Sequence, residues 1–267
     1  MALGRRLFVH SRARDGLGKR SSGAVLIPPI ERIAQTGSTN ADLLARLASG
    51  EHVGDGHWLV ADRQTAGRGR LGRGWNDGQG NFMGSTVVHL TVGDPSAATL
   101  ALVAGVALAK TVAALAPGVG AQLKWPNDLL IDGAKCAGIL MERTGNSVVI
   151  GIGVNLTAAP ELPDRPTATL AANSAPIDRD HFASALGIAM IDALWTWRQE
   201  GVASIVRAWL PQAHPVGTPL RVSEQGIEGY FDGLAEDGAL RLRRDGGETM
   251  LVHAGDVELR RPVEEGN

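Results

Sequence analysis

The fold class turns on one stretch, Thr65-Ala66-Gly67-Arg68-Gly69-Arg70-Leu71-Gly72-Arg73-Gly74-Trp75. Its first three glycines have the G-x-G-x-x-G spacing of dinucleotide-binding folds, and residues 57–62 before it are predicted to form a strand. That fingerprint also requires a helix to begin at the last glycine of the motif. Residues 73–80 contain three further glycines and cannot begin a helix, so we reject a dinucleotide-binding βαβ unit.

We call residues 65–75 the arginine loop, because their composition suits the binding of an anion. Glycine lets the backbone approach a ligand closely and adopt positive φ angles. Arginine presents a rigid fork of donors that matches phosphate or carboxylate. We therefore predict a loop that surrounds an anion with backbone N–H groups and guanidinium groups. The alternative, a solvated loop without a ligand, is unusual between two strands of a compact domain.

The middle of the chain predicts an antiparallel meander. Short strands are expected at residues 122–125 and 129–131, and Asp132-Gly133 is a strong signal for a two-residue hairpin turn. The return strand covers residues 135–142, and a further turn leads into a strand at 147–155. Consecutive antiparallel strands predict an α+β fold, in which a mixed or antiparallel sheet is flanked by helices.

Helices are predicted at residues 39–47, 97–115, 178–200 and 202–210. From residue 216 the chain changes to short alternating runs separated by turns that contain glycine, and this texture predicts a small β-barrel. The runs cover residues 219–223, 227–234, 239–243 and 249–252. We therefore predict three parts: a disordered basic leader at 1–22, a catalytic domain at 23–213 and a C-terminal β domain at 214–262.

Charge and cysteine content argue against several classes of protein. The 26 Lys and Arg residues nearly balance the 28 Asp and Glu residues, which argues against nonspecific nucleic-acid binding. Cys136 is the single cysteine, so an internal disulfide and a cysteine-based zinc site are excluded, and a reducing compartment such as the cytoplasm is expected.

The longest apolar run, residues 100–115, is interrupted by Lys110, so we expect no membrane span. The leader lacks the apolar core of a secretory signal, and a transit peptide is the alternative.

A second group of polar residues lies around the predicted hairpin of the meander. Lys124 and Lys135 are cations, and Asn127 and Asp128 lie at a turn, where a carboxylate can hold Mg²⁺ on a polyphosphate. Asn155 ends a strand flanked by glycines and could contact a base or ribose. Cations with one carboxylate suit attack on a phosphate, and no Ser-His-Asp, Cys-His or paired-carboxylate arrangement competes. These residues predict a phosphate-handling enzyme, although a solvated hairpin lysine and an ordinary turn aspartate remain alternatives.

Five short segments resemble, in the same order, the successive motifs of biotin–protein ligases. They are residues 37–40, 64–70, 124–128, 135–140 and 151–155. Each motif alone is weak, but the ordered set is specific, and the resemblance extends from Ile33 to Arg260. The C-terminal β domain is similar to the SH3-like domain of that family, and the catalytic domain to its class II synthetase-like fold.

The resemblance implies a reaction in two steps. The carboxylate of biotin attacks the α-phosphate of ATP to give biotinyl-5′-AMP, which then biotinylates one lysine of a biotin carboxyl carrier domain. A lipoate or octanoate ligase or transferase of the same fold is the alternative enzyme. A biotin-dependent repressor is the alternative from another class, and the net charge argues against it.

The resemblance also assigns residues to roles. The implied catalytic residues are Lys135, Arg68 and Arg70. The implied biotin-binding residues are Ser38, Thr39, Asn40, Gln64, Gly67, Arg68, Gly69, Arg70, Lys135 and Gly138. The implied ATP-binding residues are Arg70, Arg73, Trp75, Lys124, Asn127, Asp128 and Asn155, with Asp128 also implied as a ligand of Mg²⁺. From the residues alone, Thr39 is predicted as a helix N-cap, and capping is favoured over ligand binding as the role of Ser38, Thr39 and Asn40.

The sequence departs from the family pattern in two places. Leu71 stands where many relatives carry a basic residue, which reduces the charge of the arginine loop. Only a short segment precedes Ser38, so we expect a ligase without the DNA-binding domain of some relatives. The expected partners are therefore biotin, ATP with Mg²⁺ and the acceptor domain, with no nucleic acid or membrane, and the expected state is a monomer or homodimer.

Overall fold

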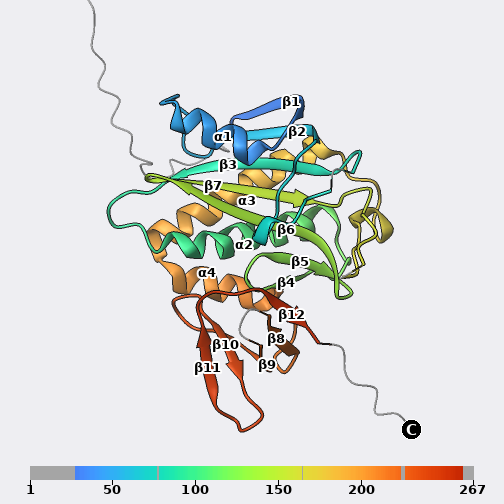
Figure 1. The fold of residues 1–267 in the computed structure, drawn as a ribbon, viewed down its shortest axis with the longest axis vertical. Coiled ribbons are helices and arrows are strands. Elements are labelled where there is room, and N and C mark those ends of the chain that lie inside the picture. The colour runs from blue at the N-terminus through green and yellow to red at the C-terminus, as the bar shows by residue number, and fades with distance from the viewer. Residues whose placement is uncertain (1–27, 77, 164, 224–225, 261–267) are drawn as a thin grey trace, which may run out of the picture.

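The computed structural model describes residues 28–76, 78–163, 165–223 and 226–260 (Figure 1). The predicted leader and the predicted start of order near Val25 lie outside these residues. The described chain has the predicted α+β architecture: a seven-stranded mixed sheet with helices, followed by a five-stranded sheet.

The large sheet has the strand order β1-β2-β3-β7-β6-β5-β4. Its strands are β1 (Ile30–Thr36), β2 (Trp58–Gln64), β3 (Phe82–His89), β4 (Gln122–Lys124), β5 (Asp128–Ile131), β6 (Ala134–Thr144) and β7 (Ser147–Val154). All neighbours pair antiparallel except β1 and β2, and the predicted meander is confirmed as β4 to β7. The parallel β1 was not predicted, because its sequence lacks a regular apolar alternation.

Helices cover both faces of this sheet. Helix α1 (Thr39–Ala48) packs Leu43 against a small cluster that includes Leu59 and Val149. The neighbouring residues Val60 and Ile150 point to the opposite face, into the main core with α2 (Leu100–Leu115), α3 (Arg179–Glu200) and α4 (Val202–Trp209). Four single turns of 3₁₀ helix lie at Arg70–Gly72, Ala97–Thr99, Leu170–Ala172 and Leu210–Gln212 of the described chain. The sheet therefore carries α1 on the face that bears the site and α2 and α3 on the other, and α4 packs against α2 and α3.

The most apolar helical segment belongs to the core. Ala97–Leu115 has 19 residues and a mean hydropathy of 1.9, so length and composition alone would allow it to cross a membrane. However, 72% of the segment is buried inside the protein, against the sheet and α3. A helix that packs on nearly all sides is apolar on all sides. This explains why Lys110, which is exposed, is the one cation within it.

The C-terminal sheet has the order β11-β10-β9-β8-β12 and is antiparallel. Its strands are β8 (Pro219–Val222), β9 (Ile227–Leu234), β10 (Leu240–Arg243), β11 (Thr249–Val252) and β12 (Val257–Leu259). The first four were predicted, whereas β12 was not. The two edge strands of this sheet, β11 and β12, do not pair with each other within the described chain. The closed SH3-like barrel therefore stays a prediction.

The C-terminal sheet lies beside the β4 edge of the large sheet (Figure 1). The indole Nε1 of Trp125, which follows β4, donates to the carbonyl of Gly238 at 3.1 Å. An isolated bridge between Leu123 and Ala213 adds backbone pairing near the junction. These buried contacts fix the second sheet against the part of the chain that carries the polar meander residues.

Candidate active site

The arginine loop is a narrow turn, not the start of a helix. Arg68 and Gly74 form an antiparallel bridge, and the N–H of Trp75 donates to the carbonyl of Gly67 at 2.9 Å. A Cβ on Gly67 would lie 2.7 Å from the carbonyl oxygen of Trp75, so only glycine fits this close approach. The tip is one 3₁₀ turn, Arg70–Gly72, after which the chain is extended. The rejection of a dinucleotide-binding unit is therefore confirmed.

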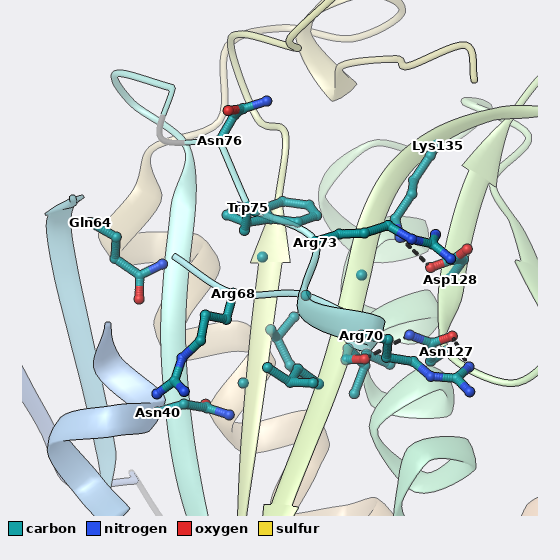
Figure 2. Close-up of a pocket in the computed structure, with 18 of the residues that line it drawn as sticks. Asn40, Gln64, Arg68, Arg70, Arg73, Trp75, Asn76, Asn127, Asp128 and Lys135 are labelled. Atoms are coloured by element: carbon teal, nitrogen blue, oxygen red, sulfur yellow. Dashed lines mark hydrogen bonds and ion pairs between the residues drawn. The ribbon is translucent and has the colours of Figure 1, made fainter. Parts of the chain in front are cut away.

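The loop folds over the large sheet and encloses a cavity with it (Figure 2). The cavity brings together most residues predicted for the site: Ser38, Thr39, Asn40, Gln64, Arg68, Gly69, Arg70, Arg73, Trp75, Asn127, Asp128, Lys135, Gly138 and Asn155. Gly67 and Lys124 do not line it; Lys124 lies behind Asp128, to which its ammonium group is bound. The two predicted cationic regions therefore face the same space.

Glycines of adjacent strands form part of the cavity wall. Gly138 of β6 and Gly153 of β7 are paired in register, and the indole of Trp75 lies over them (Figure 2). A Cβ on Gly153 would overlap that indole ring, and a Cβ on Gly138 would lie 3.1 Å from Nζ of Lys135. Bare backbone at both positions therefore lets a large planar group rest directly on the sheet. The sequence analysis assigned Gly138 but missed Gly153, although the G-I-G spacing of β7 was a signal.

Asp128 is held between two lysines. Its Oδ1 lies 2.5 Å from Nζ of Lys135 and its Oδ2 lies 2.9 Å from Nζ of Lys124, and its side chain is 6% exposed. Burial alone would raise the pKa of Asp128, but attraction to the two ammonium groups outweighs burial and lowers the pKa to about 2. The carboxylate therefore stays ionised at neutral pH and fixes Lys135 at the cavity wall.

The role of Asp128 as a ligand of Mg²⁺ stays a prediction. Each carboxylate oxygen faces one lysine ammonium group and keeps a further lone pair that a cation could use. No cluster of three or more His, Cys, Asp or Glu side chains that could hold a metal occurs in the described ranges, so a Mg²⁺ held here would also need ligands from the nucleotide. The two ammonium groups suit the phosphates of a nucleotide.

A chain of buried hydrogen bonds links α1, β2, β3 and β6. Gln64 accepts from the N–H and the hydroxyl of Thr39, at 2.8 and 3.0 Å, and that hydroxyl lies 2.6 Å from Oγ of Ser85. Ser85 donates to Oδ1 of Asn40 at 2.6 Å, and Nδ2 of Asn40 donates to Glu142 at 2.8 Å. The other oxygen of Glu142 lies 3.9 Å from Nη1 of Arg68, which closes the chain at the arginine loop. The sequence analysis missed Ser85 and Glu142, whose strand positions carry no motif signal.

The first helix turn is capped by Ser38, one residue before the Thr39 cap expected from the sequence. Oγ of Ser38 accepts from the N–H of Ala41 at 3.5 Å, a long bond, while Ser38 also lines the cavity. Thr39 and Asn40 are buried and bonded as above. The helix cap is therefore confirmed one residue earlier than predicted, and the role of these residues in binding biotin stays a prediction.

Three buried polar atoms on the predicted nucleotide side have no hydrogen-bond partner in the described chain: Nε1 of Trp75, Oδ1 of Asn155 and Oδ1 of Asp128, the last of which forms the ion pair with Lys135. The amide nitrogen of Asn155 is fixed, because it donates to the carbonyl of Ala168 at 3.1 Å. Buried polar atoms are nearly always satisfied in native proteins. One unpaired donor and one unpaired acceptor in the same cavity therefore indicate a polar ligand.

Asn127 connects the arginine loop to the meander. Its Oδ1 accepts from Nη1 of Arg70 at 3.1 Å, and its Nδ2 donates to the carbonyl of Ile139 at 2.8 Å (Figure 2). The turn position of Asn127 thus holds the Arg70 guanidinium at the cavity edge. Asp256, which directly precedes β12 of the C-terminal sheet, also lines the cavity and was missed.

Comparisons with known proteins agree with this geometry. A sequence profile described as the biotin/lipoate A/B protein ligase family matches residues 33–156, and one described as the biotin protein ligase C terminal domain matches residues 220–260. The biotin–[acetyl-CoA-carboxylase] ligase of Mycobacterium tuberculosis is 40% identical over 237 residues, covering 85% of this chain and 88% of that relative. The enzyme of the same name from Paracoccus denitrificans is 36% identical, covering 83% and 97%.

A solved structure shares the fold. The biotin protein ligase of Aquifex aeolicus, in complex with biotin and ATP, superposes with a TM-score of 0.76 at 25% identity, covering 87% of this chain and 99% of that one. The sequence relatives are similar over most of their own length as well as most of this chain. The chain therefore belongs to the biotin–protein ligase family.

Proposed function

We propose that this protein is an ATP-dependent ligase that activates biotin as biotinyl-5′-AMP and transfers it to a lysine of a biotin carboxyl carrier domain. One observation carries the proposal beyond family membership: the arginine loop and Lys135 line a single cavity. Both reactants of the first step are anions, so bringing them together requires cations from more than one direction. The cavity provides such cations.

We place the polar ring of biotin against the hydrogen-bonded chain of Gln64, Thr39 and Ser85. Gln64 uses its oxygen to accept from Thr39, which leaves its amide nitrogen as the donor toward the cavity. Ser38 and the backbone of Arg68 and Gly69 complete this end of the cavity. Groups held by a buried network lose little entropy when a ligand binds, which favours one orientation of the ring.

In the first step, a carboxylate oxygen of biotin attacks the α-phosphorus of ATP. The new oxygen–phosphorus bond forms as the bond to the β,γ-pyrophosphate breaks, and pyrophosphate leaves. Lys135 and Arg70 stand at the cavity wall, where their positive charges stabilise the charge that develops between the two anions. Mg²⁺ bound with the ATP would reduce the negative charge of the phosphates, and Asp128 could contribute a carboxylate oxygen to it.

In the second step, the neutral amine of the acceptor lysine attacks the acyl carbon of biotinyl-5′-AMP. The amide bond forms, the bond from the acyl carbon to the AMP oxygen breaks, and the amine loses a proton to solvent. The arginine loop with Trp75 covers the sheet on this side, which limits attack by water on the mixed anhydride.

Incubation with biotin, Mg-ATP and a carrier domain, followed by intact-mass measurement, tests the proposal. We expect the carrier to gain the mass of one biotinyl group, and to gain none without ATP. A parallel incubation with octanoate or lipoate is the control for the related acyl ligases. Modification of the carrier of those acids, with no transfer of biotin, would overturn the assignment.

We also propose the finer features that go with this activity. The C-terminal module forms an SH3-like barrel, the domains divide near residue 213, and the enzyme acts in the cytoplasm without nucleic acid. Cys136 supports a reducing compartment, because it is free and fully buried. Light scattering of the purified protein, with and without biotin, measures whether it is a monomer or a homodimer.

A further inference from the structure

Three consecutive residues at the start of β12, the two that precede the strand and its first residue, contact three cations of the candidate active site. The carbonyl of Gly255 accepts from Nη2 of Arg70 at 3.1 Å, and the carbonyl of Val257 accepts from Nζ of Lys124 at 2.6 Å. Between them, the carboxylate of Asp256 forms an ion pair with Nη2 of Arg73. The segment 255–257 therefore offers one oxygen to each of three positive side chains.

This segment is held firmly in the C-terminal sheet. The carbonyl of Asp256 accepts from the N–H of Ser223 at 2.9 Å, and Val257 pairs with Val222 in the β8–β12 ladder. Gly255 has a φ of 146°, which residues with a side chain rarely adopt. The bend at Gly255 and the anchored strand together fix where the carboxylate of Asp256 lies.

The ion pair joins a buried acid to a more exposed base. The side chain of Asp256 is 12% exposed and lines the cavity, whereas that of Arg73 is 40% exposed and belongs to the arginine loop. An arginine on an exposed loop samples many rotamers, and ordering it when a ligand arrives costs binding free energy. A partner that orders it beforehand removes part of that cost.

We propose that Asp256 is a positioning residue for the first half-reaction. Its carboxylate holds the Arg73 guanidinium in the position where it binds the phosphates of ATP. The inference rests on the proposed function. This role makes the C-terminal module part of the nucleotide site, because Asp256 directly precedes the anchored strand β12. Asp256 touches Arg73 rather than the reacting atoms, so it acts through that arginine.

The competing hypothesis is that the same contact weakens the binding of ATP. A carboxylate that occupies the position of a phosphate would compete with ATP, and its removal would then tighten nucleotide binding. The two effects predict changes of opposite sign in the KM for ATP. A single measurement therefore separates them.

The experiment compares Asp256→Asn with Glu258→Gln as the matched control. Glu258 lies two residues further along the chain, is exposed, and accepts from Ser223 outside the cavity. In biotin-dependent pyrophosphate release, we expect Asp256→Asn to raise the KM for ATP roughly three- to tenfold, the range of a charge-assisted bond at a partly exposed site. The KM for biotin and the transfer of preformed biotinyl-5′-AMP to the carrier should stay at wild-type values, which also shows that the variant is folded.

A double-mutant cycle with Arg73→Ala tests whether Asp256 acts through Arg73. We expect Asp256→Asn to have no further effect on the KM for ATP in the Arg73→Ala background, and Asp256→Glu to recover part of the loss in the wild-type background. An unchanged or lowered KM for ATP in Asp256→Asn, or losses that multiply in the cycle, would overturn the inference. Absence of pyrophosphate release from the wild type would instead overturn the proposed function.

Discussion

The two cationic regions of the site differ in how the protein holds them. The arginine loop is an exposed turn: Arg68 is 49% exposed and Leu71 at the tip is 61% exposed. The region around Asp128 is part of the sheet, with Lys124 11% exposed and bonded on two sides. A loop can open for a ligand, whereas a buried ion pair keeps its geometry. The comparison indicates that the sheet sets the position of the reaction and the loop closes over it.

The largest expected effect comes from the sheet side of this comparison. Lys135→Ala removes the ammonium group at the cavity wall, and we expect biotin-dependent pyrophosphate release to fall about 10²- to 10³-fold, as for the loss of one preorganised donor. Lys110→Ala, an exposed change on α2, is the control and should keep full activity. Circular dichroism checks the fold of both variants. Wild-type pyrophosphate release from Lys135→Ala would refute the assignment of this lysine.

The second prediction tests the surface on which the loop closes. Gly153→Ala places a methyl group where the Trp75 indole lies, so the indole must leave the sheet and the loop cannot close in the same way. We expect kcat/KM to fall about tenfold, because the loop no longer closes over the sheet in the same way. We expect only a small change in the free energy of unfolding, because the Trp75 side chain belongs to a loop and can shift. Gly54→Ala is the matched control, since a Cβ there meets nothing within 4 Å. Full activity in Gly153→Ala would show that the contact of Trp75 with the sheet is dispensable.

The third prediction uses the buried carboxylate to measure what the sheet side contributes to stability. The pKa of Asp128 falls from 3.8 to about 2 on folding, so its contribution is present above pH 4 and is lost as the pH falls toward 2. Linkage converts this difference to about 2 kcal/mol of unfolding free energy at neutral pH. We therefore expect the stability of the wild type to fall more steeply between pH 4 and pH 2 than that of Asp128→Asn.

Urea unfolding at several pH values measures this difference, with Asp245→Asn, an exposed hairpin variant, as the control. Equal acid sensitivity of Asp128→Asn and the wild type would show that the ion pair does not carry the effect. Loss of Asp128 also frees Lys135 from its partner, so we expect slower pyrophosphate release in the same variant.

The sequence predicted the sheet-borne side of the site better than its surroundings. Turn signals such as Asp132-Gly133 located the meander, and a φ of 49° at Asp132 confirms the sharp turn. In contrast, β1 and β12 have short or irregular patterns, and their pairing depends on neighbours far away in the chain. Local periodicity cannot report such contacts.

The same limit applies to the site. Residues within motifs line one cavity. Asp256 lines it from a position with no motif, and Glu142, also outside the motifs, contacts its wall residue Asn40. Each can be identified only from the residue that it contacts in the fold, which is Asn40 for Glu142 and Arg73 for Asp256. Both of these contacts join different elements of the chain. The chemistry of the site could therefore be predicted from sequence, whereas the groups that hold its side chains in place could not.

The smallest expected effect is at the tip of the arginine loop. Leu71 has a φ of 56° and an exposed side chain, so replacing it with arginine loses no buried contact and should change unfolding free energy by less than about 0.5 kcal/mol. A fourth arginine in the loop should attract ATP, and we expect Leu71→Arg to lower the KM for ATP by about twofold at low ionic strength. Leu71→Gln is the control for polarity without charge. Salt screens exposed charges, so the gain should vanish at high ionic strength. A gain that persists there would mean that the new arginine contacts the nucleotide directly, and that the loop tip lies closer to the bound phosphates than the exposure of Leu71 indicates.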